Sequence, residues 1–150
     1  CTCGNNGCLE AYAGGWALAR NAREAVKNKQ KGGEPLLEAA QGNLENITGG
    51  MVADLAREGN PLAKSIIDDA IEALAAATSS LINILGPQKI IFGGGVVEGM
   101  PEIIDCIAKK ARKRALSAAF EHVVIVPAKL RNDAGAIGAG ALADRLYVSK

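Results

Sequence analysis

The sequence predicts an α/β fold in which helices pack on a mixed or parallel sheet. From residue 61 onward the hydrophobic patterns follow the order helix, strand, helix, strand, helix, which is typical of a sheet covered by helices. Hydrophobic residues make up 49% of the chain but aromatic residues only 3%, so small and aliphatic side chains dominate, as in closely packed helices. A length of 150 residues allows one domain with its own core.

The first third of the chain is predicted to be helical. Apolar residues recur at helical spacing and predict one helix over residues 9–27, which ends in the polar stretch KNKQKGG. The weakly patterned segment that follows predicts a short helix near residues 34–41. A second short helix is expected over residues 50–57.

A long helix is predicted to begin after Asn60. Asparagine caps helices well, and Pro61 at the first helical position loses no hydrogen bond that the helix would have made. Its expected buried stripe consists of Ile67, Ile71, Leu74, Thr78, Leu81 and Leu85. The Gly86-Pro87 pair stops the helix.

Two short apolar runs predict buried strands in the second half. KIIF at residues 89–92 and VVIVP at residues 123–127 are rich in β-branched side chains and end at glycine or proline. Between them Pro101 begins a helix whose residues Ile103, Ile104 and Ile107 are expected to face inward, with Cys106 beside them as an ordinary core thiol. A final helix is predicted over residues 134–146.

Charge and composition exclude several classes of protein. Lys and Arg total 17 against 16 Asp and Glu, so no strong field favours nucleic acid or an anionic membrane. The basic run KKARKR lies in the last turns of a predicted helix, where cations complement the dipole and face water. No apolar run is long enough to span a membrane, and four cysteines do not make a disulfide framework, so a soluble protein of the reducing cytoplasm is expected.

Three cysteines fall within the first eight residues. Cys1, Cys3 and Cys8 lie on a loop of Gly and Asn residues, which can place three sulfurs around one tetrahedral zinc ion. Reduced cysteines in a turn or a redox site are the alternatives, although the usual C-x-x-C redox spacing is absent. The only histidine, His122, is over a hundred residues away and is more typical of a surface residue than of a fourth ligand.

A triple glycine, Gly93, Gly94 and Gly95, follows the first predicted strand. The segment FGGGVVEG lacks the Lys and Ser/Thr of a P-loop, and Glu98 stands where G-x-G-x-x-G requires its last glycine. Glycines at a strand end let a flat ligand approach the backbone closely. The residues alone leave this interpretation and a tight strand-to-helix turn open.

Three segments resemble one family. CTCGNNGCLEAYAGG resembles the C-x-C-G-x-x-G-C-x-E signature of the ROK family of repressors, open reading frames and sugar kinases, and it matches every fixed position. The segment from DLAREGNP to KIIFGGGV is similar to the family's long helix, strand and glycine loop, and NDAGAIGAGALA is similar to its closing helix. The likeness covers essentially the whole chain, and the cysteine motif is its specific part.

The resemblance implies an actin-like, ribonuclease-H-like two-lobed fold and phosphorylation of hexoses by ATP with Mg²⁺. Cys1, Cys3 and Cys8 match three ligands of a structural zinc, whose fourth ligand is a histidine of an upstream Gly-His motif. Glu10 matches a glutamate that hydrogen-bonds sugar hydroxyls, and residues 93–95 match contacts on the adenosine side of the nucleotide. Close packing behind the nucleotide is implied for the small residues of the closing helix, Gly135, Gly138, Ala139 and Ala141.

The same resemblance implies that residues 1–150 form the C-terminal lobe of such a kinase. Its parts would be a zinc loop at 1–10, a helical region at 11–86, a strand and glycine loop at 89–99, and a closing strand and helix at 123–146. The N-terminal lobe, with a D-x-G-x-T phosphate loop and a general-base Asp, would be absent, so this chain alone should be inactive.

We expect a glucokinase that binds hexose and ATP as a homodimer or tetramer and does not bind membranes. One alternative is the sugar-sensing lobe of a ROK repressor, which adds a DNA-binding helix-turn-helix. Another is a folded dimerisation module.

Overall fold

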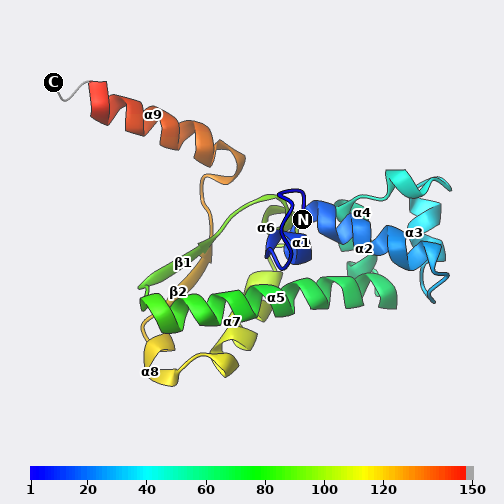
Figure 1. Ribbon diagram of the computed structural model, residues 1–150, viewed down its shortest axis with the longest axis horizontal. Coiled ribbons are helices and arrows are strands. Elements are labelled where there is room, and N and C mark those ends of the chain that lie inside the picture. The colour runs from blue at the N-terminus through cyan, green and yellow to red at the C-terminus, as the bar shows by residue number, and fades with distance from the viewer. Residues whose placement is uncertain (148–150) are drawn as a thin grey trace.

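The computed structural model describes residues 1–147 and shows a helical body built along one long helix, with a small sheet at one end. Helix α5 (Pro61–Leu85) runs through the molecule, with α1, α2 and α4 packed near its N-terminal and central parts and α7 and α8 along it (Figure 1). The strands β1 and β2 lie beside its C-terminal end (Figure 1). No helix among these residues is long and apolar enough to cross a bilayer.

The first predicted helix is broken into two. Residues 9–27 form α1 (Glu10–Ala13) and α2 (Gly15–Lys27), separated by Gly14 in an extended conformation with φ −73° and ψ 150°. The prediction of one helix is therefore wrong. Each glycine of the Gly14-Gly15 pair weakens a helix by about 1 kcal/mol relative to Ala, yet the pair does not interrupt the helical spacing of the apolar residues.

The next helices agree with the sequence within one or two residues at each end. Helix α3 (Glu34–Ala39) is followed by a 3₁₀ turn, η1 (Leu44–Asn46), which was not predicted, and by α4 (Gly49–Arg57). The guanidinium of Arg23 on α2 holds the η1 segment by donating hydrogen bonds to the carbonyl oxygens of Leu44, Glu45 and Ile47 at 2.9–3.1 Å. This turn therefore depends on a contact from outside the segment.

Helix α5 begins and ends as predicted. The Oδ1 atom of Asn60 accepts a hydrogen bond from the backbone N–H of Ala63 at 2.9 Å, and Gly86 ends the helix in the left-handed conformation. Its buried face is made mostly of Ala and Ile, with Leu62, Thr78 and Ser79. Leu81 and Leu85 were predicted to be buried but are 47% and 68% exposed. Leu81 precedes the buried Ile82 by one residue, or about 100° of helical rotation, and Leu85 is the last residue of the helix. These small side chains let helices approach it from two sides.

The sheet consists of β1 (Lys89–Phe92) and β2 (Val124–Pro127), which pair in parallel from Lys89↔Val124 to Phe92↔Pro127. Ile90, Phe92 and Ile125 pack against the core, whereas Ile91 is 61% exposed. The prediction of fully buried strands is therefore wrong, because helices cover only one face of this sheet within the described residues. Two helices of four or five residues were also missed, α6 (Gly95–Gly99) and α8 (Ser117–Phe120).

Helix α7 (Ile103–Arg114) packs on α5 through Ile103, Ile104 and Ile107, which are buried as predicted. Cys106 is exposed, which contradicts its prediction as a core thiol. It precedes Ile107 by one residue, or about 100° of helical rotation, and falls outside the buried stripe.

Helix α9 (Ala134–Tyr147) has the predicted range but not the predicted packing. No residue of α9 is buried, and the helix stands apart from the body beyond the 3₁₀ turn η2 (Arg131–Asp133) (Figure 1). The close packing expected for Gly135, Gly138, Ala139 and Ala141 is therefore absent among the described residues, because no other described element lies against this helix face.

Ion pairs join α5 to α7 at their solvent edge. The Glu72 carboxylate on α5 accepts hydrogen bonds from the Lys110 ammonium and the Arg114 guanidinium on α7. The bond from Lys110 and then the two positive charges hold the pKa of the Glu72 carboxyl below its ordinary value. The ionised carboxylate is thus favoured in the folded state.

We predict that Glu72→Gln lowers the melting temperature by a few degrees at neutral pH. Because folding depresses the pKa of Glu72, its contribution is present above the ordinary value of 4.5 and disappears as the pH falls through the folded-state value. Melting curves from pH 7 downward should therefore converge for the two proteins as the pH falls below 4.5 and through the lower folded-state pKa of Glu72. Asp69→Asn, an exposed change on the same helix at a residue with no ion pair among those described, should lack this convergence.

Candidate functional site

The three N-terminal cysteines converge in space. The Sγ atoms of Cys1, Cys3 and Cys8 all lie within 4.8 Å of one another, and those of Cys3 and Cys8 are 3.4 Å apart. Gly4 and Gly7 adopt positive φ values of 84° and 75°, which fold the loop back on itself. All three thiols are free.

This arrangement fits a zinc ion. Two sulfurs at about 2.3 Å from one tetrahedral zinc lie about 3.8 Å apart, which is close to the 3.4 Å between the Cys3 and Cys8 sulfurs and inside the 4.8 Å that bounds all three pairs. The backbone N–H of Asn5 and then the neighbouring thiol of Cys8 lower the pKa of the Cys3 thiol, which favours the thiolate that binds metal. Among the described residues no carboxylate or histidine joins the cluster. His122 is exposed in the turn two residues before β2, as a surface residue would be.

Glu10 follows the cysteine loop directly. It is the first residue of α1, and its neighbour Ala11 donates a backbone hydrogen bond to the Cys8 carbonyl oxygen at 2.9 Å. The Glu10 side chain is exposed, and its Oε1 accepts a hydrogen bond from Nε1 of Trp16 at 3.0 Å. The position of this carboxylate is therefore set by the loop before it and by the helix after it.

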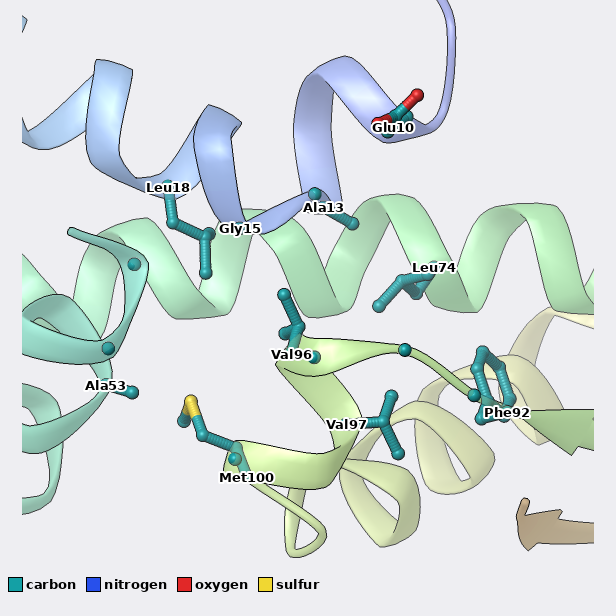
Figure 2. Close-up of a pocket in the computed structure, with 17 residues that line it drawn as sticks. Glu10, Ala13, Gly15, Leu18, Ala53, Leu74, Phe92, Val96, Val97 and Met100 are labelled. Atoms are coloured by element: carbon teal, nitrogen blue, oxygen red, sulfur yellow. The ribbon is translucent and has the colours of Figure 1, made fainter. Parts of the chain in front are cut away.

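A cavity of about 450 Å³ lies between the starts of α2 and α4 and the β1–α6 turn (Figure 2). Figure 2 shows Glu10 on α1 at one edge, with Val96, Val97 and Met100 from α6 and its C-cap across the space. Residues of three segments far apart in the sequence meet here. The glycines that line it are Gly14, Gly15, Gly49, Gly50, Gly93, Gly94, Gly95 and Gly99.

The structure thus brings Glu10 and Gly93, Gly94 and Gly95 into one cavity, as their assignment to one site requires. The cysteine loop does not line it but adjoins it through α1. Glu10 is the single ionisable side chain among the described residues that line this space. Apolar walls, exposed backbone and one carboxylate suit a ligand that is partly flat and partly hydroxylated, but the lining itself supplies no second acid or base.

Sequence reasoning missed the two glycine pairs that open α2 and α4. A Cβ atom on Gly49 would lie 2.6 Å from the carbonyl oxygen of Gly15, so the two backbones approach more closely than side chains allow. Paired glycines at a helix start were the available signal, but nothing local shows that Gly15 and Gly49 meet.

Comparisons with known proteins agree on one family. The sequence profile of the ROK family matches residues 1–146. A glucokinase of Streptomyces coelicolor is 31% identical over 144 residues, which cover 95% of this chain and 45% of that protein. The transcriptional regulator NagC of Escherichia coli is 28% identical over 149 residues, which cover 99% of this chain and 34% of that protein.

A solved structure agrees with these matches. The crystal structure of a ROK family glucokinase from Streptomyces griseus, in complex with glucose and AMPPNP, superposes with a TM-score of 0.81 at 30% identity. The superposition covers 97% of this chain and 47% of that one. The chain therefore spans about half the length of the glucokinases it matches.

We predict that Gly49→Ala destabilises the protein by about 1–3 kcal/mol, because the added methyl group would collide with the Gly15 carbonyl and force α2 and α4 apart. Gly50→Ala is the matched control, since its Cβ would meet nothing nearer than Thr48 Oγ1 at 3.7 Å. Urea unfolding of both variants measures the difference. Equal stability of the two would contradict the close backbone approach.

Proposed function

The chain belongs to the ROK family, and we propose that it is the C-terminal lobe of an ATP-dependent hexose kinase of the glucokinase type. The observation that carries this proposal is the single cavity shared by Glu10 and Gly93, Gly94 and Gly95. A kinase must hold its phosphoryl donor and acceptor side by side, and one cavity with a carboxylate at one edge and open backbone at another suits that task.

In this proposal Glu10 accepts hydrogen bonds from sugar hydroxyls, and residues 93–95 contact the adenosine side of ATP. The hexose hydroxyl attacks the γ-phosphorus, the bond to ADP breaks, and the hydroxyl proton passes to a base. No second carboxylate lines the cavity among the described residues. Because the chain spans about half of the glucokinases it matches, we assign the general base and the phosphate loop to the other half of the complete protein.

Zinc has a structural role in this proposal. Cys1, Cys3 and Cys8 would hold the ion, which supplies folding free energy and no reaction step. Since Glu10 lies two residues after Cys8, an ordered loop also orders the start of α1.

The alternative function is the sugar-sensing lobe of a repressor, which the likeness to NagC supports. The basic run on α7 does not itself favour DNA binding. Lys110 and Arg114 pair with Glu72, and the Arg112 guanidinium lies 5.2 Å from the centre of the Phe120 ring. A D-x-G-x-T phosphate loop in the complete protein would support the kinase, and a DNA-reading helix would support the repressor.

We predict that the purified chain holds about one zinc ion, bound by three thiolates with water as a substitute ligand and thus weakly. Cys3→Ser combined with Cys8→Ser should abolish zinc binding and lower the melting temperature. Cys106→Ser, which removes an exposed thiol outside the cluster, should change neither. Metal analysis that finds stoichiometric zinc in the double variant would overturn the zinc site.

The nucleotide role is tested at Gly95. Gly94 has φ 109°, so any side chain there strains the backbone, whereas a Cβ on Gly95, which lines the cavity, meets nothing within 4 Å. In the complete protein, Gly95→Val should raise KM for ATP about tenfold and KM for glucose less than about twofold, with an unchanged melting temperature. Gly95→Ala should give a smaller rise of the same kind. Equal rises in KM for ATP and for glucose would instead favour a tight strand-to-helix turn with no nucleotide contact.

A further inference from the structure

We infer that Trp16 is the positioning residue of the sugar site and acts by holding the Glu10 carboxylate in one orientation. The inference rests on the proposed role of Glu10 and extends it to a residue outside the cysteine motif. Its basis is the hydrogen bond from Trp16 Nε1 to Glu10 Oε1 at 3.0 Å.

Glu10 needs such a partner because its side chain is exposed. A free glutamate at a helix start samples several rotamers. Binding a ligand fixes one rotamer, and the lost conformational entropy reduces the affinity. The indole N–H fixes Oε1, while Oε2 has no protein hydrogen-bond partner among the described residues. The second oxygen is therefore available to a hydroxyl group.

The chemistry of the donor also matters. Indole is neutral and only donates, so it orients the carboxylate without cancelling its charge. An arginine or lysine at this place would form an ion pair and compete with the ligand for the carboxylate. Trp16 therefore leaves Glu10 as a charged acceptor, which is the stronger partner for a sugar hydroxyl.

The break between α1 and α2 makes this contact possible. A Cβ on Gly14 would lie 2.7 Å from the Glu10 carbonyl oxygen, 3.0 Å from Glu10 Cγ and 3.2 Å from Trp16 Nε1. The two partners thus close over Gly14, where a larger residue would push them apart. The glycine that interrupts the predicted helix is the residue that allows the indole to turn back toward Glu10.

Arg20 holds the indole in turn. Its guanidinium lies 5.2 Å from the centre of the Trp16 ring, one helical turn further along α2. The same group donates a hydrogen bond from Nη2 to the Ala11 carbonyl oxygen at 3.0 Å. Glu10, Trp16, Arg20 and the α1 backbone therefore form a closed ring of contacts between α1 and α2.

The test is glucose binding by the complete protein, measured by calorimetry for Trp16→Phe, Glu10→Gln and the double variant. Phenylalanine removes the N–H but keeps an aromatic face beneath Arg20, so the melting temperature should change little. We expect Trp16→Phe to weaken glucose binding about tenfold and to leave ATP binding unchanged. In the Glu10→Gln background the same change should weaken glucose binding less than about twofold, because the carboxylate through which Trp16 acts is gone.

The outcomes separate two failures. If Glu10→Gln weakens glucose binding and Trp16→Phe does not, the positioning role is wrong and the proposed function stands. Equal effects of Trp16→Phe in both backgrounds would show a merely structural tryptophan and would also overturn the inference. If Glu10→Gln itself leaves glucose binding unchanged, the proposed sugar role of Glu10 fails, and the role of Trp16 fails with it.

Discussion

Packing against helix α5 is the constraint that fixes the positions of the other helices of the body. Its stripe of Ala and Ile side chains contacts α1, α2 and α4 and also α7 and α8, so both parts of the fold use one helix as a common support. The caps at Asn60 and Gly86 fix where this support begins and ends. A helix of 25 residues is about 38 Å long, enough to support elements from before and after it in the sequence.

The cavity follows from this arrangement. With α1, α2 and α4 held on α5, the glycine pairs at the starts of α2 and α4 meet, and the β1–α6 turn closes the third side. The glycines that line the cavity lack a side chain for two different reasons. Gly49 lacks a side chain because the Gly15 backbone occupies its place, whereas Gly95 lacks one beside open space. Only a position of the second kind can be assigned to a ligand.

Much of this organisation could be predicted from the sequence where a local signal was strong. The caps of α5, the apolar runs of β1 and β2 and the isoleucines of α7 each specify an element without help from elsewhere. Elements that depend on specific side-chain contacts were missed. Arg23 holds η1 from 21 residues away, and a contact between Trp16 and Glu10 accompanies the break at Gly14.

The candidate site shows the same division. Cys1, Cys3, Cys8 and Glu10 lie in one motif and could be named from the sequence, and the structure places the three thiols together. Their assigned roles stay predictions. Trp16 and Gly49 could not be found, because the role of Trp16 depends on a side-chain contact across the break at Gly14 and that of Gly49 on a close approach of two backbones.

The parallel pairing of β1 with β2 has a consequence for the order of folding. The two strands are separated along the chain by α6, α7 and α8, so closing that loop costs entropy before any ladder hydrogen bond forms. A sheet of two four-residue strands is only marginally stable by itself. We therefore expect α7 to dock on α5 first and the two strands to pair late, on a surface that the helices have already formed.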